Sequence, residues 1–150
     1  MNSLQNLVIG IDPDVSKSGV ACIDKKTKTF ELKTLTFFEL FDYLELHKEF
    51  IKEVRIEASW LIKKTNWHSN NMGTGVASRI GSKTGANHEV GRKIVEMCIH
   101  KDIPFVQVKP LKKHWKGANG KITHKEIEMI APGFPKKSNQ EQRDAFLLIL

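Results

Sequence analysis

Four carboxylates in this 150-residue sequence lie at positions where an acid could take part in catalysis or would otherwise destabilise the fold. Asp12 ends the apolar run Leu7–Asp12 (LVIGID), which predicts a strand buried on both faces. A carboxylate at the end of such a strand is costly unless it is paired or bound to a metal ion. Glu57 follows the short segment VRI, and Glu141 lies three residues before Asp144, so a helix would project both from one face.

Two strand-borne acids and a helix-borne pair could meet at one end of a sheet. Ligand sets made only of oxygen select hard cations such as Mg²⁺, with Mn²⁺ as a substitute. Four carboxylates are more than one Mg²⁺ usually takes, whereas two ions could clamp both oxygens of an in-line phosphoryl displacement. Bound metal would also explain how an acidic pocket in a basic protein accepts a phosphodiester. The joint pattern therefore predicts a two-ion phosphoryl-transfer site.

Each acid also has an ordinary structural explanation. Asp12 precedes a proline, and Asp-Pro commonly starts a turn. Strand alternation could place Glu57 on a solvated face, and Glu141 could close a capping box with Ser138. Asp144 is different, because the apolar run AFLLIL that follows it must be largely buried and an acid at its head needs a partner.

The segments that would position these acids alternate between strand and helix patterns. The sequence predicts five strands, over Leu7–Asp12, Gly19–Asp24, Thr29–Thr36, Val54–Glu57 and Ile103–Val108. The polar connection Lys25–Thr27 predicts a hairpin, and Ala58–Thr84 is rich in Asn, Ser, Gly and Lys, which predicts a partly mobile loop.

Helices are predicted after Thr36, over Gly85–Lys101 and through most of the chain after the fifth strand. Thr123 with Glu126 is a further candidate capping box. No internal repeat or low-complexity linker interrupts the chain, so residues 1–150 are expected to form one α/β domain with a mixed sheet.

The charge balance points to a polyanionic partner. Lys and Arg number 24 and Asp and Glu number 17, which gives a net charge of +7. The sequence contains no basic amphipathic helix of the kind that binds a membrane surface, so nucleic acid is the expected partner. No apolar run approaches the ~20 residues of a membrane helix, and the opening MNSLQN does not resemble a signal peptide, so a cytoplasmic protein is expected. Cys22 and Cys98 lie in apolar segments and are expected to be buried, reduced thiols.

Four blocks of the chain resemble the RuvC family of Holliday-junction resolvases, which are RNase H-like endonucleases. The blocks are IGIDPDVSKSGVACID, IEASW, GRKIVEMCIHKDIP followed by VKPLKKHWKGANGKITHKEI, and EQRDAFLLIL. They span nearly the whole chain in the family's order. The resemblance implies an RNase H-like fold, with a five-stranded mixed sheet flanked by helices.

The same resemblance implies a catalytic centre in which Asp12, Glu57, Glu141 and Asp144 hold the two divalent ions. A metal-activated water would attack the phosphorus of DNA and leave 5′-phosphate and 3′-hydroxyl ends. Two positions depart from the family pattern, since Asp14 stands where glycine is usual and Glu141 replaces the more usual Asp or His.

Basic and aromatic residues receive roles from the resemblance as well. Lys112 and Lys125 fall where the family keeps active-site lysines. Trp60 falls where the family places an aromatic that stacks on an unpaired base at the junction centre. Its alternative is partial burial beside Leu61 and Ile62. Further DNA-backbone contacts are expected from Lys63, Lys64, Arg79, Lys83, Lys109, Lys113, Lys116 and Lys121.

These observations favour a homodimeric endonuclease, bacterial or phage-encoded, that nicks a four-way junction symmetrically. A C2 dimer matches a symmetric junction, and the predicted Gly85–Lys101 helix is the expected interface. The alternatives are a nuclease of the same fold for RNA, hybrids or general branched DNA, and a catalytically weak branched-DNA-binding protein. The first block also resembles the phosphate loop of actin-like ATPases and sugar kinases, but 150 residues cannot hold their duplicated domains and second loop.

Overall fold

The computed structural model describes residues 4–62 and 74–150, and within these it forms a five-stranded sheet of order β3-β2-β1-β4-β5. The strands are β1 (Leu7–Asp12), β2 (Ser18–Asp24), β3 (Thr29–Leu35), β4 (Ile51–Glu57) and β5 (Phe105–Val108). β1 pairs antiparallel with β2, and β2 with β3, whereas β4 runs parallel to both β1 and β5. The predicted mixed sheet is confirmed.

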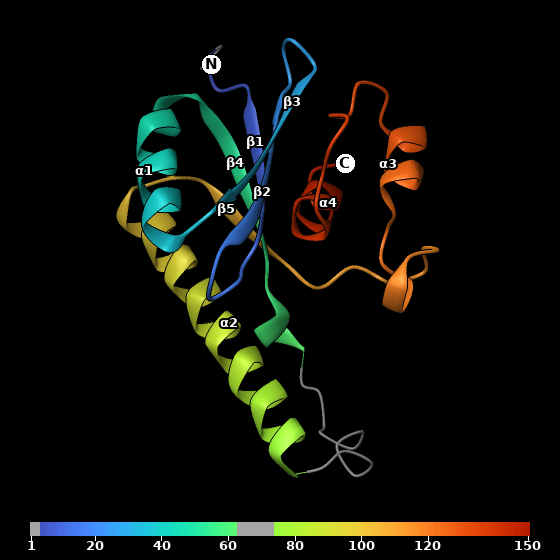
Figure 1. The fold of residues 1–150 in the computed structure, drawn as a ribbon. Coiled ribbons are helices and arrows are strands. Elements are labelled where there is room, and N and C mark those ends of the chain that lie inside the picture. Colours follow the sequence, from blue (N-terminus) through green and yellow to red (C-terminus); the bar gives the residue numbers. More distant parts are fainter. Residues whose placement is uncertain (1–3, 63–73) are drawn as a thin grey trace.

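Helices cover both faces of the sheet (Figure 1). They are α1 (Phe37–His47), α2 (Thr74–His100), α3 (His124–Ile130) and α4 (Gln140–Leu147). α1 and α2 lie on one side, α3 and α4 lie on the other, and α2 extends well past the end of the sheet (Figure 1).

The central strand β1 is apolar because it faces a core on each side. Ile9 and Ile11 are fully buried in the cluster beneath α1 and α2. Val8 points the opposite way, into a second cluster that contains Phe146 and Ile149 from the end of the chain. Alternate residues of a strand face opposite sides of a sheet, so a strand with helices on both sides carries a continuous apolar run.

Local sequence signals explain several helix boundaries. Thr36 caps α1 and Thr123 caps α3, each through a capping box with the glutamate three residues later, as predicted for Thr123 and Glu126. Cys22 and Cys98 are buried free thiols, as expected.

Two predictions of local structure are wrong. The helix after the fourth strand was expected to begin at Gly85, but α2 begins at Thr74. The chain after β5 was expected to be mainly helical, whereas residues 109–117 form no helix and lead through a short 3₁₀ turn, Ala118–Gly120, to α3. Asn119 and Gly120 adopt left-handed backbone conformations there, with φ of 56° and 75°, which a continuous helix does not permit.

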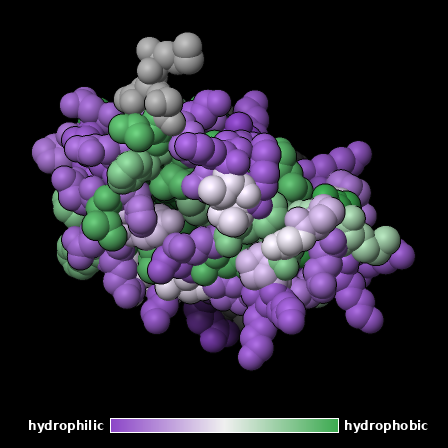
Figure 2. Space-filling view, turned by 90° about the horizontal axis from the view of Figure 1, so that it is seen from above, coloured by the Kyte–Doolittle hydropathy of each residue, from purple (hydrophilic) through white to green (hydrophobic). Residues whose placement is uncertain are grey.

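The face seen from above is mostly hydrophilic, with apolar side chains gathered in small groups between the polar ones (Figure 2). Among the described residues, no helix has both the length and the apolar character needed to cross a membrane.

Candidate active site

Asp12 and Glu57 are placed together by the pairing of two parallel strands. β1 and β4 are in register with Ile11 opposite Ile56, and the two acids are the next residues on each strand. Parallel strands end at the same edge of a sheet, so both carboxylates emerge at the carboxyl end of the central pair.

Asp144 reaches this edge because α4 lies unusually close to the sheet. A Cβ atom added at Gly10 of β1 would stand 2.2 Å from the carbonyl oxygen of Ala145, and one at Gly19 of β2 would stand 2.2 Å from that of Glu141. Such distances are not tolerated between real atoms, so any larger residue at either position would push α4 outward. The two glycines therefore determine how closely α4, which carries Asp144, packs on the sheet.

One pocket joins the acids to a basic loop. Among the described residues, the carboxylates of Asp12, Glu57 and Asp144 share this pocket with Lys112, Lys113 and Lys121. Its apolar and glycine lining consists of Leu111, Trp115, Gly120, Ile122 and Leu147. Of the six residues predicted to form the catalytic centre, four line this pocket and two, Glu141 and Lys125, do not.

The electrostatics of the pocket show how crowded the carboxylates are. Burial is the main cause that raises the pKa of Asp12 from its usual 3.8 to about 8. The negative charges of Glu57 and Asp144 raise that pKa further, and the ammonium of Lys121 lowers it. Burial and like charge both penalise an ionised carboxylate, so the site favours a compensating cation or proton.

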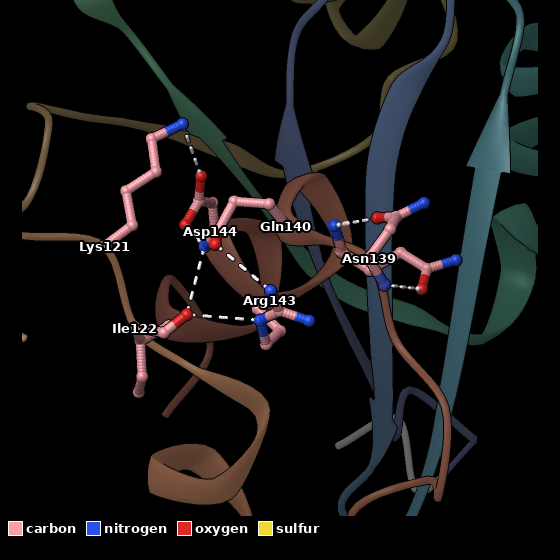
Figure 3. A network of polar contacts seen from close by, with 7 residues as sticks. Lys121, Ile122, Asn139, Gln140, Arg143 and Asp144 are labelled. Atoms are coloured by element: carbon pink, nitrogen blue, oxygen red, sulfur yellow. Dashed lines mark hydrogen bonds and ion pairs between the residues drawn. The ribbon is translucent and has the colours of Figure 1, made fainter. Parts of the chain in front are cut away.

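The loop from residue 109 to 122 brings lysines to the pocket by folding back on itself. The backbone N–H of Trp115 donates to the carbonyl of Gly120 at 2.9 Å, and that of Gly117 donates to the carbonyl of Lys121 at 2.9 Å. Trp115 also packs on the core beneath α3 and α4, which anchors the loop. The fold-back carries Lys121 to Asp144, where its Nζ lies 3.6 Å from Oδ2 (Figure 3).

Lys121 is a site residue whose place the sequence prediction missed, because it was assigned to a DNA-backbone face. The glycines and asparagine of residues 117–120 were a usable signal, since such residues punctuate turns and predict a reversal of the chain. Lys125, predicted as an active-site lysine, is exposed on α3 and does not line the pocket.

Glu141 stands apart from the other acids. It lies in the first turn of α4, is exposed and does not line the pocket, although its charge contributes slightly to the raised pKa of Asp12. The predicted capping box with Ser138 is wrong. Asn139 caps α4 instead, in a capping box with Gln142. The helix therefore begins one residue later than a cap at Ser138 would require.

Trp60 is partly buried against α2. Its ring occupies the space left by Gly91, where an added Cβ would stand 2.2 Å from Cζ3, and the guanidinium of Arg92 lies 5.9 Å from its centroid. The ring also packs against the core cluster beneath α1 and α2. Partial burial, the alternative to base stacking, is thus observed, with α2 as the packing partner.

The remaining predicted DNA contacts are dispersed. Arg79 and Lys83 are exposed on α2, and Lys109 and Lys116 are exposed outside the pocket. Lys63 and Lys64 lie outside the described residues.

The donor set of the pocket fits a hard divalent cation, because its ligands would be carboxylate oxygens that already repel one another. In residues 4–62 and 74–150, however, no three His, Cys, Asp or Glu side chains are gathered closely enough to hold an ion as they stand. Metal binding by Asp12, Glu57 and Asp144 would therefore require their side chains to turn toward the ion.

Comparisons with known proteins give similarity in structure but not in sequence. No protein-family model matches the chain, and no curated protein matches it. Among solved structures, T. thermophilus RuvC in complex with a Holliday junction substrate is similar over 95% of this chain and 88% of that one, with a TM-score of 0.53 and 12% identity.

The yeast mitochondrial Holliday junction resolvase Ydc2 is similar over 94% of this chain and 76% of that one, at 12% identity. Its TM-score of 0.36 is too low to support an argument. The similarity to RuvC extends over most of both chains and includes the five-stranded mixed sheet of this one. The chain therefore has the RNase H-like α/β fold that the sequence motifs predicted.

Proposed function

We propose that this chain is a divalent-metal-dependent endonuclease that acts on branched DNA, with the four-way junction as its preferred substrate. One observation carries the proposal: Asp12, Glu57 and Asp144 come from β1, β4 and α4 to one pocket that also contains lysines. Acids alone would repel a phosphodiester, and lysines alone would bind it without reaction. Their combination suits hydrolysis of a phosphate ester.

Within this proposal, Asp12, Glu57 and Asp144 are the residues that would hold the metal, with Mg²⁺ preferred and Mn²⁺ as a substitute. Bound metal would supply the positive charge that activates water and neutralises the scissile phosphate. Lys112, Lys113 and Lys121 would bind the phosphate oxygens. Glu141, which is exposed and does not line the pocket, would join a second ion only if its side chain turned inward.

Three observations support branched DNA as the substrate. The fold is that of RuvC, whose solved structure holds a Holliday junction substrate, and the net charge of this chain is +7. Exposed basic residues lie on α2 and along the loop beside the pocket, where they could follow a DNA backbone. Symmetric nicking would follow from a C2 homodimer, for which the segment Gly85–Lys101, most of it in α2, is the proposed interface.

A second candidate function is a branched-DNA-binding protein without turnover. It is favoured by the spacing of the carboxylates, since no three acidic or imidazole side chains in the described part of the chain stand ready to hold an ion. DNA binding and DNA cleavage must therefore be measured separately.

The test is cleavage of an end-labelled four-way junction by the purified protein, with and without Mg²⁺. We expect metal-dependent nicks at symmetric positions, and Asp144→Asn should keep junction binding while losing cleavage. Asp102→Asn is the matched control, because Asp102 is exposed in the turn after α2 with φ of 54°, a conformation that Asn adopts readily. Tight binding without cleavage would select the second function, and equal cutting of linear duplex would remove the preference for junctions.

A further inference from the structure

The carboxylate of Asp144 interacts with two side chains, the ammonium of Lys121 and the neutral amide of Gln140. Gln140, one helical turn earlier on α4, donates from Nε2 to Oδ1 of Asp144 at 2.9 Å. The same Nε2 donates to the backbone carbonyl of Ile122 at 3.2 Å. Lys121 approaches the other carboxylate oxygen, so the two oxygens of Asp144 have different partners (Figure 3).

The orientation of the Gln140 amide is determined by its neighbours. Nη2 of Arg143 lies 3.1 Å from Oε1 of Gln140, and a guanidinium can only donate hydrogen bonds. The opposite end of the amide faces a backbone carbonyl and a carboxylate, which can only accept. Both ends agree, so the NH₂ group must point at Asp144.

Arg143 is itself anchored to the backbone. Its Nε donates to the carbonyl of Ile122 at 3.2 Å, and its Nη1 donates to the carbonyl of Ser138 at 3.0 Å and to the hydroxyl of Ser138 at 2.9 Å. The carbonyl of Ile122 therefore accepts from both Gln140 and Arg143. That double contact ties α4 to the backbone of the residue that follows Lys121 (Figure 3).

We propose that Gln140 is a positioning residue for Asp144, and that Arg143 keeps its amide oriented while both residues hold the Lys121 loop in place. This inference rests on the proposed function, because it assigns Gln140 a part in metal binding by Asp144. One hydrogen bond to Oδ1 leaves further acceptor positions on both oxygens of the carboxylate. Gln140 thus limits the rotation of the carboxylate without blocking it, as residues behind metal ligands commonly do.

Gln142 offers a matched control two residues further along the same helix. Its side chain accepts from the backbone N–H of Asn139 at 3.0 Å and donates to the hydroxyl of Thr34 at 3.1 Å, which are structural contacts away from Asp144. Gln140→Met and Gln142→Met remove the same amide from α4. The first cuts the link to Asp144, whereas the second removes part of the helix cap.

The experiment is a Mn²⁺ titration of the full chain without DNA, followed by the loss of the free-Mn²⁺ electron paramagnetic resonance signal, with thermal unfolding recorded in parallel. Gln140→Met should weaken Mn²⁺ binding by about tenfold, the size expected when a group behind a metal ligand is lost. Gln142→Met should lower the unfolding temperature and leave Mn²⁺ binding within about twofold of the unsubstituted chain. Arg143→Met should weaken Mn²⁺ binding in the same direction as Gln140→Met, since the amide is then free to turn.

The outcomes separate this inference from the proposed function. Suppose that the unsubstituted chain binds Mn²⁺ and that Asp144→Asn abolishes this binding. If Gln140→Met then leaves the binding unchanged, the inference about Gln140 is overturned but the proposed metal site is retained. If Gln140→Met and Gln142→Met weaken binding equally, the effect of Gln140 is general stability and the inference is overturned. If the unsubstituted chain binds no Mn²⁺, the metal-dependent function and the inference fail together.

Discussion

Gly10 in β1 lies directly against the carbonyl oxygen of Ala145 in α4, at a distance that leaves no room for a side chain: an added Cβ would stand 2.2 Å from that oxygen. Ala145 follows Asp144 in the chain, so the absence of a side chain at Gly10 determines how near Asp144 comes to Asp12. The contact connects the core of the sheet to the geometry of the pocket.

Gly10→Ala should therefore destabilise the protein and displace Asp144. Overpacking of this kind costs about 1–3 kcal/mol, because α4 or the strand must shift. The measurement is the free energy of unfolding from urea denaturation, together with junction cleavage at saturating Mg²⁺. Gly85→Ala is the control, since nothing lies within 4 Å of an added Cβ at Gly85 on α2, and alanine should raise helix stability by about 1 kcal/mol. Equal stability of both variants would contradict the close approach of α4.

The raised pKa of Asp12 predicts how stability depends on pH without metal. The folded state binds the Asp12 proton more tightly than the unfolded chain does, with a pKa of about 8 against 3.8. A carboxyl group of this kind makes the folded state lose stability as pH rises from about 4 to about 8. Asp12→Asn should therefore stabilise the metal-free protein by about 1–3 kcal/mol at pH 8, and by much less near pH 4.

Unfolding in EDTA across this pH range measures the effect, and Asp102→Asn is the control for loss of a negative charge elsewhere. Metal ligands must be deprotonated, so Mg²⁺ should raise the unfolding temperature more at pH 8 than at pH 6. Stability that is insensitive to Asp12→Asn at every pH would contradict the crowding of acids in the pocket.

Lys121 and Lys125 make a matched pair for testing which lysine serves the site. Lys121 lines the pocket and contacts Asp144, whereas Lys125 is exposed on α3. Lys121→Met should slow single-turnover cleavage of a junction by about tenfold or more, because the charge that stabilises the transition state is lost. Lys125→Met should stay within about twofold. A larger loss in Lys125→Met would favour the assignment that the family motif implies.

Trp60→Ala tests whether the indole ring packs the core or contacts DNA. The ring fills the space above Gly91, so alanine should cost about 2 kcal/mol of stability, less than the loss of a fully buried tryptophan. Chemical denaturation gives the cost, and Trp60→Phe should recover much of it. A variant that keeps full stability but cuts junctions slowly would instead assign Trp60 to the DNA.

The strands and the strand-borne acids could be predicted from the sequence because their signal is local. The run LVIGID is apolar along its length, which implied a central strand, and a carboxylate at its end implied a site. The structure adds that Glu57 ends a parallel neighbour of β1, and no pattern within either strand specifies that pairing.

The start of α4 could not be decided from spacing alone. Ser138 with Glu141 and Asn139 with Gln142 have the same i, i+3 spacing, and both pairs suit a capping box. In the fold the Ser138 hydroxyl contacts His124 and Arg143, and Asn139 is left to cap the helix. Tertiary contacts of Ser138 thus determine which of the two locally equivalent residues caps α4.

Packing between distant segments explains the other differences. Gly91 makes room for Trp60 from 31 positions away, and a glycine in a helical pattern gives no sign of what lies above it. Gly75 and Gly81 lie in the part of α2 that was not predicted, and each lowers intrinsic helix propensity by about 1 kcal/mol relative to alanine.

The central claim is that Asp12, Glu57 and Asp144 form one metal site, and anomalous diffraction from Mn²⁺-soaked crystals tests it most directly. We expect a manganese peak within coordination distance of oxygens from all three side chains, and we expect it to disappear in crystals of Asp144→Asn. A peak bound elsewhere, or an empty pocket at Mn²⁺ concentrations that support cleavage, would contradict it.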